Sequence, residues 1–336
     1  MESSKQPELD PLPVSSWDNK SFSEYVHRTR EELVQLRMKF SLWGALRDVA
    51  ILPGGMEVWY GDSANGPYYV KISGGPGTLA FDIMCCRADI PRYNCSLAIS
   101  GDVVQDIEPR PFIDLDDCVD PDLEDCSEEI AKLPLIDVDP EKHFIKNPTY
   151  RQEIRNLLQC QGSRFVVQLL GKSMAGELVF DRVKSTLEHS AIFNSNNGRI
   201  QNIKRWMLEA IDGVAYLHSQ GIVHRDLTAK NILDPVSSPL VICDLQCLNS
   251  TFFCRPFEHD GSDLRKFSYA SDIFALGAVL WQCCFYNAPL NRYVMLEYAP
   301  PPPFRRIFQA CTAVCPEERP TLPQLKAMYE AIVIEN

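Results

Sequence analysis

One short segment of the chain brings together side chains that can move protons, hold metal ions and neutralise phosphate charge. Asp226, Lys230 and Asn231 lie within six positions of one another, and Asp244 follows Asp226 by 18 residues. A carboxylate can take the proton of an attacking hydroxyl group, and carboxylate or amide oxygens can bind Mg²⁺. Together these residue types could serve proton transfer from a hydroxyl group beside a bound metal ion.

The same segment carries a motif that can be read as a whole. Residues 224–231 read HRDLTAKN and follow an amphipathic helical pattern that Gly221 is expected to end. The motif resembles the catalytic loop of eukaryotic-type protein kinases, H-R-D-L-x-x-x-N, in every fixed position. The resemblance covers about residues 147–331, most specifically 224–320, and it is to divergent, fungal-type kinase-like proteins. This resemblance implies that Asp226, Lys230 and Asn231 are catalytic and that Asn231 binds Mg²⁺.

A short apolar run ends in the second acidic residue. Residues 240–244 read LVICD, and the separation of Asp226 from Asp244 is the one that the kinase family shows. The resemblance implies that Asp244 is the main Mg²⁺ ligand and the first residue of the D-F-G motif, which here reads Asp-Leu-Gln. Leu245 can pack as the Phe does. Gln246 stands where the family has a glycine, which removes a flexible hinge.

The catalytic-loop motif leaves the type of acceptor hydroxyl open. Lys230 resembles the basic residue that tyrosine kinases keep just before the Asn, whereas serine/threonine kinases usually carry a Lys at the position of Thr228. The resemblance implies a protein substrate with a Ser/Thr or Tyr hydroxyl group and ATP as the phosphate donor.

Two further motifs of the C-terminal half have structural roles in the family. Residues 271–281 resemble its buried central helix, in which Asp272 holds the backbone of the catalytic loop. Arg319, in the motif CPEERP, is expected to pair with Glu258. The segment from Asp244 to Glu258 covers only 14 positions, which leaves little room for a regulatory phosphosite.

The nucleotide side of the site is expected upstream. Asn147 as N-cap and Pro148 at the first position predict the start of a helix. Glu153, in the second turn of that helix, is the candidate partner of the lysine that binds ATP. Lys146 directly precedes the helix and can reach back to Glu153. Lys71 stands in a strand pattern more like that of the family, but it lies 82 residues before Glu153, so both lysines stay open, as does the lack of a functional one.

The rest of the nucleotide side carries weaker patterns. Strands are expected over 165–170 and 177–180, and Asp181 and Val183 after them resemble the hinge that receives adenine in the family. Residues 54–59, GGMEVW, resemble a glycine-rich loop only faintly, and G-x-G-x-x-G occurs nowhere in the chain. The backbone amides that cover the phosphates in the family are therefore not identified.

Residues 1–113 resemble no family that we recognise. A helix is expected over 21–40, and a hairpin with strands at 56–60 and 67–72. Nine acidic residues and no basic one follow between positions 114 and 129, and they supply most of the net charge of −12. This acidic segment is read as a solvated linker, with docking of a basic protein partner as the alternative.

The 336 residues have the composition of an ordinary soluble protein, with 45% hydrophobic and 23% charged residues. No apolar run is long enough to span a membrane, and the first residues lack a signal-peptide core, so no membrane partner is expected. The absence of a basic patch argues against nucleic-acid binding. The 13 cysteines form no CxxC pair and are read as reduced, mostly buried thiols, which indicates an intracellular location, cytoplasmic or nuclear.

These expectations add up to the α+β class and a bilobal protein-kinase-like fold. A helical C-lobe is expected over 184–336, a divergent, shortened N-lobe over 131–183, an acidic linker over 114–130, and a β-rich N-terminal module with one helix over 1–113. The resemblance implies ATP and Mg²⁺ as cofactors. The main alternative is a pseudokinase acting as a nucleotide-binding or scaffold module. Arg225 argues against a small-molecule phosphotransferase, because such enzymes usually carry a small residue there.

Overall fold

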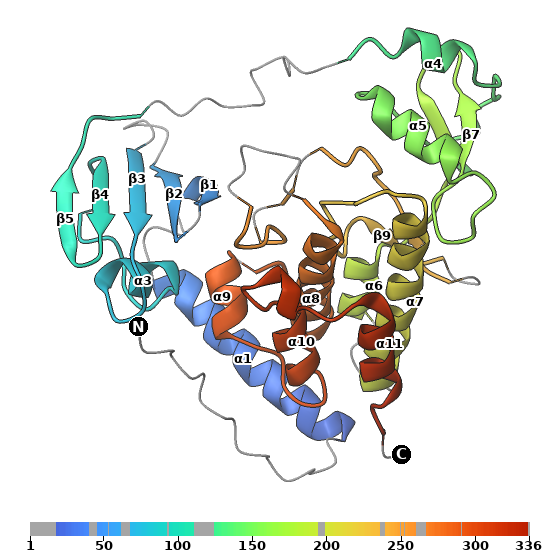
Figure 1. Cartoon of the computed structure of the whole chain (residues 1–336). Coiled ribbons are helices and arrows are strands. Elements are labelled where there is room, and N and C mark those ends of the chain that lie inside the picture. Colours follow the sequence, from blue (N-terminus) through green and yellow to red (C-terminus); the bar gives the residue numbers. More distant parts are fainter. Residues whose placement is uncertain are drawn as a thin grey trace.

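The computed structural model describes most of the chain. The described residues are 18–39, 46–52, 54–61, 68–92, 94–110, 124–193, 199–235, 239–248, 250–251, 253–259, 267–289 and 291–334. They form a helical body, which includes the two-stranded sheet of β9 and β10, and two larger sheets of three and five strands, so the architecture is mixed α and β (Figure 1).

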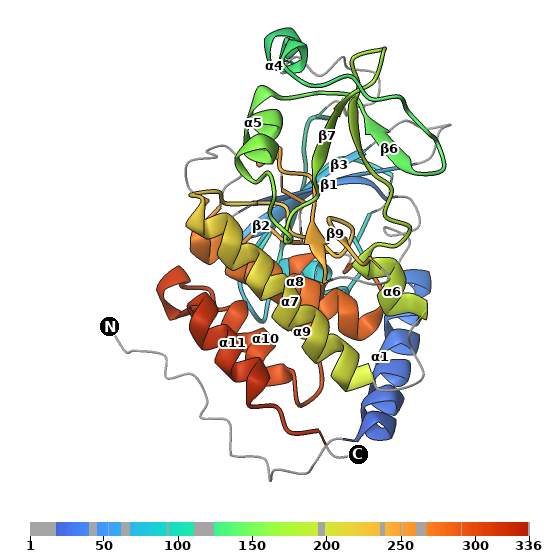
Figure 2. The same ribbon diagram turned by 90° about the vertical axis from the view of Figure 1, so that its right-hand side faces the viewer.

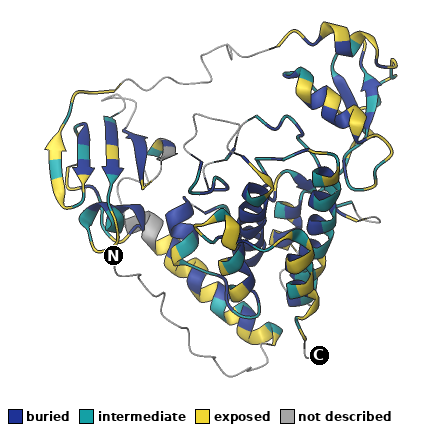
Figure 3. Cartoon of the chain, viewed as in Figure 1, coloured by how far each residue is buried: buried dark blue, intermediate teal, exposed yellow. Residues whose placement is uncertain are grey.

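A buried helix is the centre of the helical body. Helix α8 (Tyr269–Phe285) is apolar on nearly all sides and buried at almost every position, as its sequence predicts (Figure 3). The other elements of the helical body surround or border it: α6 (Leu187–Phe193), α7 (Arg199–Ser219), α9 (Arg292–Glu297), α10 (Arg305–Cys311), the 3₁₀ turn Pro316–Glu318, α11 (Leu322–Glu330), β9 (Ile232–Leu233) and β10 (Val241–Ile242) (Figure 2).

The predicted N-terminal helix is confirmed as α1 (Asn19–Lys39). Its apolar residues Phe22, Val26 and Leu33 are buried in the same core as α7 and α8. The Asn19 side chain accepts a hydrogen bond of 3.0 Å from the backbone N–H of Ile200, near the start of α7. The grouping of this helix with the following strands in 1–113 stays a prediction, but the helix packs on the helical body.

The sheet unit (residues 46–110) is the five-stranded sheet with its one helix. The strand order is β1-β2-β3-β4-β5, and all neighbours are antiparallel except β3 and β4, which α3 connects. The predicted hairpin is confirmed, and its turn at 62–66 lies outside the described residues. The bounds are β1 (Leu46–Leu52), β2 (Gly55–Tyr60), β3 (Tyr68–Ser73), α3 (Leu79–Met84), β4 (Leu97–Ser100) and β5 (Val103–Asp106).

The small sheet is the three-stranded sheet that lies above α7 (Figure 1). Its order is β6-β8-β7, with antiparallel neighbours; the strand expected over 177–180 is β8, whereas the strand expected over 165–170 begins only at Leu169. The small sheet and its helices are β6 (His143–Lys146), β7 (Leu169–Lys172), β8 (Leu178–Asp181), α4 (Ser127–Ala131) and α5 (Arg151–Gln159).

The predicted start of α5 at Asn147 and Pro148 was wrong, because the helix begins at Arg151. Its first N–H group donates to the Glu124 carboxylate at 2.8 Å, so a residue distant in sequence occupies the N-terminus of the helix. Residues 114–123 of the acidic segment lie outside the described residues. Its end forms α4, where Glu129 pairs with Arg155 of α5 at 2.7 Å.

Within the described ranges, no helix combines enough length and apolarity to cross a bilayer. The twelve cysteines that fall in those ranges are all free thiols. Most of them are buried, which agrees with the prediction of reduced, buried cysteines.

Candidate active site

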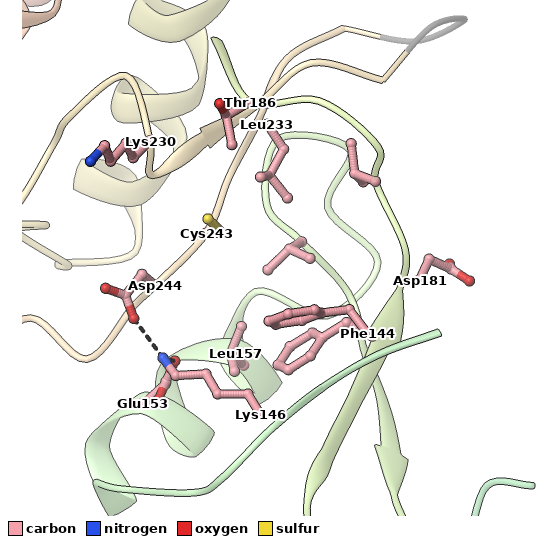
Figure 4. Close-up of a pocket in the computed structure, with 13 residues that line it drawn as sticks. Phe144, Lys146, Glu153, Leu157, Asp181, Thr186, Lys230, Leu233, Cys243 and Asp244 are labelled. Atoms are coloured by element: carbon pink, nitrogen blue, oxygen red, sulfur yellow. Dashed lines mark hydrogen bonds and ion pairs between the residues drawn. The ribbon is translucent and has the colours of Figure 1, made fainter. Parts of the chain in front are cut away.

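A cavity of about 390 Å³ lies between the small sheet and the helical body. Its walls are mainly apolar, and three charged side chains meet at one end (Figure 4). The lining residues are Phe144, Lys146, Glu153, Leu157, Val167, Phe180, Asp181, Val183, Thr186, Lys230, Leu233, Cys243 and Asp244.

Lys146 connects the small sheet, α5 and the segment after β10. Its Nζ donates to Glu153 Oε1 and to Asp244 Oδ1, both at 2.6 Å. Burial alone would lower the pKa of the Lys146 ammonium, but the two carboxylates outweigh this and raise it. Burial raises the pKa of the Glu153 carboxyl, and Lys146 opposes that effect. The arrangement holds a cation at the end of the cavity where Glu153 and Asp244 lie.

The alternative lysine lies elsewhere. Lys71 is an exposed residue of β3 in the sheet unit and does not line the cavity. Gly54 and Gly55, in the faint resemblance to a glycine-rich loop, lie at the turn between β1 and β2 of the same sheet. The strand pattern around Lys71 therefore belongs to the sheet unit and not to the nucleotide side.

The catalytic-loop motif is held from below by α8. Asp272 is fully buried and accepts hydrogen bonds of 2.9 Å from the backbone N–H groups of His224 and Arg225. It also contacts the ring of His218 on α7 at 2.9 Å. Arg225 has a φ of 74°, a conformation that a non-glycine residue adopts only where its surroundings fix it. The role expected for Asp272 is confirmed.

Asp226 and Asn231 of this loop are in direct contact. The Asn231 amide nitrogen donates to the backbone oxygen of Asp226 at 2.9 Å and to its Oδ2 at 3.1 Å. The amide oxygen of Asn231 therefore remains for a metal ion. The other carboxylate oxygen of Asp226 accepts a hydrogen bond of 2.6 Å from the backbone N–H of Thr251.

Gln246 does more than replace a flexible glycine. Its amide nitrogen donates to Asp244 Oδ2 at 3.1 Å, so this carboxylate is held by Lys146 on one oxygen and by Gln246 on the other. Asp244 has a φ of 62°, which aims its side chain towards Lys146. Leu245 is fully buried, as predicted, and its backbone oxygen accepts a hydrogen bond of 2.8 Å from Asn156 of α5.

The remaining candidates lie at the rim of the cavity. Asp181 is exposed at the end of β8, and its carboxylate points away from the other lining side chains (Figure 4). Val183 and Lys230 line the cavity, and Lys230 is exposed. Cys243 precedes Asp244, and burial raises the pKa of its thiol to about 12, so it is a neutral wall residue.

Several features of the site were missed at the sequence level. Phe144 shares a face of β6 with Lys146, and this spacing of two could have placed it in the wall of the cavity. The hydrogen bond of Gln246 to Asp244 joins residues only two positions apart, but the motif alone did not predict it, whereas the bond of Thr251 to Asp226 spans 25 positions and depends on tertiary packing. The pair of Arg319 with Glu258 was predicted and is confirmed, with both carboxylate oxygens bound at 2.7 Å.

The side chains present fit a nucleotide and a magnesium ion. No group of three or more His, Cys, Asp or Glu residues that could hold a metal occurs in the part of the chain that the structure describes. Mg²⁺ typically binds one or two carboxylates and completes its shell with phosphate oxygens and water. Asp244 and the amide oxygen of Asn231 suit such a shared site, and the apolar walls suit a planar base.

Comparison with known proteins agrees with this geometry. Residues 135–249 match the family model of the protein kinase domain. The chain is 32% identical over 90 residues to a dual serine/threonine and tyrosine protein kinase of Gallus gallus, which covers 23% of this chain and 9% of the relative. It is 26% identical over 223 residues to a Dictyostelium discoideum protein named as a probable serine/threonine-protein kinase, which covers 56% of this chain and 15% of the relative.

A third relative is the proto-oncogene serine/threonine-protein kinase mos of Rattus norvegicus. It is 28% identical over 125 residues, which cover 32% of this chain and 37% of the relative. The chain thus spans between 9% and 37% of the length of these three proteins.

Proposed function

We propose that this chain, which belongs to the protein kinase superfamily, transfers the γ-phosphoryl group of ATP to a serine or threonine hydroxyl group of a protein. The observation that carries the proposal is the pair of ion pairs from Lys146 to Glu153 and Asp244. They lie at one end of a cavity of about 390 Å³. The names of the relatives support the hydroxyl type, and tyrosine is the alternative that the Lys230 position leaves open.

The nucleotide would bind with its base among the apolar walls and its phosphates towards the charged end. Phe144, Val183 and Leu233 exclude water from the base, and the backbone between Asp181 and Val183 supplies polar groups at the rim. Lys146, kept charged by its two carboxylate neighbours, neutralises phosphate charge. Asp244 and Asn231 would hold Mg²⁺.

The acceptor side uses the catalytic loop. Asp226 takes the proton of the acceptor hydroxyl, and the Asn231 amide and Thr251 N–H orient its carboxylate. Lys230 is exposed at the cavity rim and approaches the transferred group. Mg²⁺, when bound, lowers the negative charge on the phosphates and so eases attack by the hydroxyl oxygen.

Transfer of radiolabelled phosphate from Mg²⁺-ATP, to the chain itself and to a generic protein substrate, tests the proposal. Lys146→Met, Asp226→Asn and Asp244→Ala should each abolish labelling, whereas Lys71→Met is the matched control and should label as the native chain does. Phosphoamino-acid analysis then names the hydroxyl. A folded native chain that transfers no label to either acceptor would contradict the proposal.

A second candidate function is nucleotide binding without transfer, as in a pseudokinase. Gln246 favours it, because its amide occupies the oxygen of Asp244 that a metal ion would otherwise approach. This candidate expects a thermal shift with ATP that Lys146→Met removes, together with no transfer by the native chain. Restored transfer in Gln246→Gly would assign the loss to this one amide.

A further inference from the structure

The sheet unit docks on one short helix of the helical body (Figures 1 and 2). Tyr293 of α9 is buried in the core of the sheet unit, where its ring meets Phe81 of α3 at 6.3 Å. Its hydroxyl donates to the backbone oxygen of Gly55 at 3.3 Å. The fully buried Asn291 donates to the backbone oxygen of Met84 at 3.4 Å. The sheet unit therefore contacts the start of α9 through its strand β2 and its helix α3.

A surface ion pair adds to this contact. Arg87, which follows α3, pairs with Glu297 at the end of α9 at 2.5 Å. The two side chains are 48% and 35% exposed, so the pair lies at the rim of the contact, while Asn291 and Tyr293 lie inside it. The contact thus has an apolar, hydrogen-bonded centre and a charged edge.

Arg292, between Asn291 and Tyr293, contacts the segment that ends at Glu258. Arg292 is fully buried and donates to the backbone oxygens of Arg255 and Pro256 at 3.4 and 3.2 Å. Its guanidinium group lies over the ring of Phe257 at 4.3 Å. Phe257 also meets the ring of Tyr293, at 6.4 Å. Helix α9 therefore contacts both the sheet unit and the 255–257 backbone, and the rings of Tyr293 and Phe257 meet between them.

That backbone in turn reaches the proposed base. Arg255 donates to the backbone oxygen of Ser250 at 2.9 Å, and the Cys254 thiol donates to the backbone oxygen of Leu227 at 3.0 Å. The N–H of Thr251 donates to Asp226 Oδ1 at 2.6 Å. A continuous series of contacts thus runs from the sheet unit through α9 to Asp226.

We propose that the sheet unit is an internal positioning device for the acceptor side of the site. By docking on α9 it fixes the backbone of residues 250–251 and 253–257, and the Thr251 N–H then orients the Asp226 carboxylate without any phosphorylation of the short segment. Asn291 and Tyr293 are positioning residues in this scheme. The effect on transfer rests on the proposed function, whereas the effect on the Thr251 amide does not.

The double variant Asn291→Asp/Tyr293→Phe weakens docking with little change of volume. Asp at 291 keeps the oxygen that caps α9 by accepting from the Val294 N–H, but it loses the donor to Met84. Phe at 293 keeps the ring and loses the hydroxyl bond to Gly55. The measurements are hydrogen exchange of the Thr251 amide, kcat and KM for transfer, and the thermal shift with ATP.

In this variant we expect the Thr251 amide to exchange roughly tenfold faster and kcat to fall by a similar factor, since each lost bond contributes modestly. The KM for ATP and the thermal shift should stay within about twofold of the native values, because the nucleotide cavity is not part of the contact series. A merely structural role would lower the melting temperature and leave the Thr251 amide as protected as before.

A charge reversal with a compensating second change tests docking separately from loss of folding. Glu297→Arg places two cations together at the rim, and adding Arg87→Glu restores the pair, so Thr251 exchange should rise in the first and return in the second. The matched control is Asp106→Arg, which likewise places two cations together, at the exposed pair with Arg92 elsewhere on the sheet unit. Unchanged Thr251 exchange in both docking variants would overturn the proposal. Absence of transfer by the native chain would refute the proposed function alone, because exchange would still decide this inference.

Discussion

The sheet unit and the small sheet differ in how far their strands are buried. Every residue of β2 in the sheet unit is buried, and the strands share a core with α3. In the small sheet, Phe144 and Ile145 of β6 are 51% and 40% exposed. Yet β6 carries Lys146, which joins the sheet to Glu153 and Asp244, whereas β3 carries the exposed Lys71.

The more buried sheet is thus not the one that carries the charged residues of the proposed site. The well-packed sheet contributes stability and, by the inference above, fixes the acceptor side from a distance. The small sheet forms one wall of the cavity, and it shares Leu169, Leu178 and Phe180 with the core of the helical body, while Lys146 adds ion pairs at the site. Changes to the small sheet should therefore alter activity and stability together, and changes to the sheet unit should act on stability first.

The largest expected effect is on the proposed base, which belongs to neither sheet. Asp226→Asn removes the proton acceptor but keeps an oxygen that can accept the Thr251 N–H, so the fold should persist. Loss of a general base typically costs 10²–10⁴-fold in rate, and we expect kcat to fall by about that factor. Single-turnover labelling measures the loss, and an unchanged thermal shift with ATP serves as the control. Transfer within threefold of native would contradict the role of Asp226.

The second prediction contrasts the two lysines. Lys146→Met leaves Glu153, which is 2% exposed, without its cation, and should lower the free energy of unfolding by about 3 kcal/mol. Lys71→Met changes an exposed residue and should stay within about 0.5 kcal/mol of native. Urea unfolding measures both. Adding Glu153→Leu to Lys146→Met should recover part of the loss, and failure to do so would show that the ion pair does not attach the small sheet.

The sequence predicted the site better than the fold around it, for a physical reason. Asp226, Asn231 and Asp244 lie on short segments whose spacing the chemistry itself fixes, and Asp272 and Arg319 follow fixed patterns nearby. Lys146 and Lys71 could not be separated by counting residues, because only the sheet topology shows that Lys71 belongs to another sheet.

Features that depend on distant contacts were missed or misplaced. The start of α5 was misplaced because Glu124, 27 positions away, occupies the helix end. The hydrogen bond from Thr251 to Asp226 spans 25 positions, and the packing of α1 on the helical body joins residues about 180 positions apart. Such contacts are set by tertiary packing, which local spacing does not encode.

A third prediction probes the packed sheet. A Cβ on Gly55 would lie 2.3 Å from the backbone oxygen of Ile72, so Gly55→Ala must push β2 and β3 apart. We expect a loss of about 2 kcal/mol in the free energy of unfolding, in the range of overpacked cores. Gly75→Ala is the matched control, because nothing lies within 4 Å of its added Cβ. Equal melting temperatures for the two variants would show that β2 and β3 can separate freely.

The smallest expected effect is the pH dependence of the Lys146 ion pairs. The carboxylates raise the pKa of this lysine above its ordinary value of 10.5, so the folded protein holds the proton more tightly than the unfolded chain does. Its contribution to stability is therefore complete below pH 10.5 and is lost as the pH rises through the folded-state pKa. The difference in unfolding free energy between the native chain and Lys146→Met should be constant from about pH 7 to 9 and should shrink above about pH 10.5.

Urea unfolding of both chains across this range measures that difference, and groups that titrate in both chains cancel. The sheet unit gives a contrasting series, because the loss caused by Gly55→Ala is steric and should not follow the same titration. A Lys146 difference that grows as the pH rises would mean that the neutral amine is preferred in the folded state. Burial would then outweigh the carboxylates, and the ion pairs of Lys146 would add nothing to the apolar packing that joins the small sheet to the helical body.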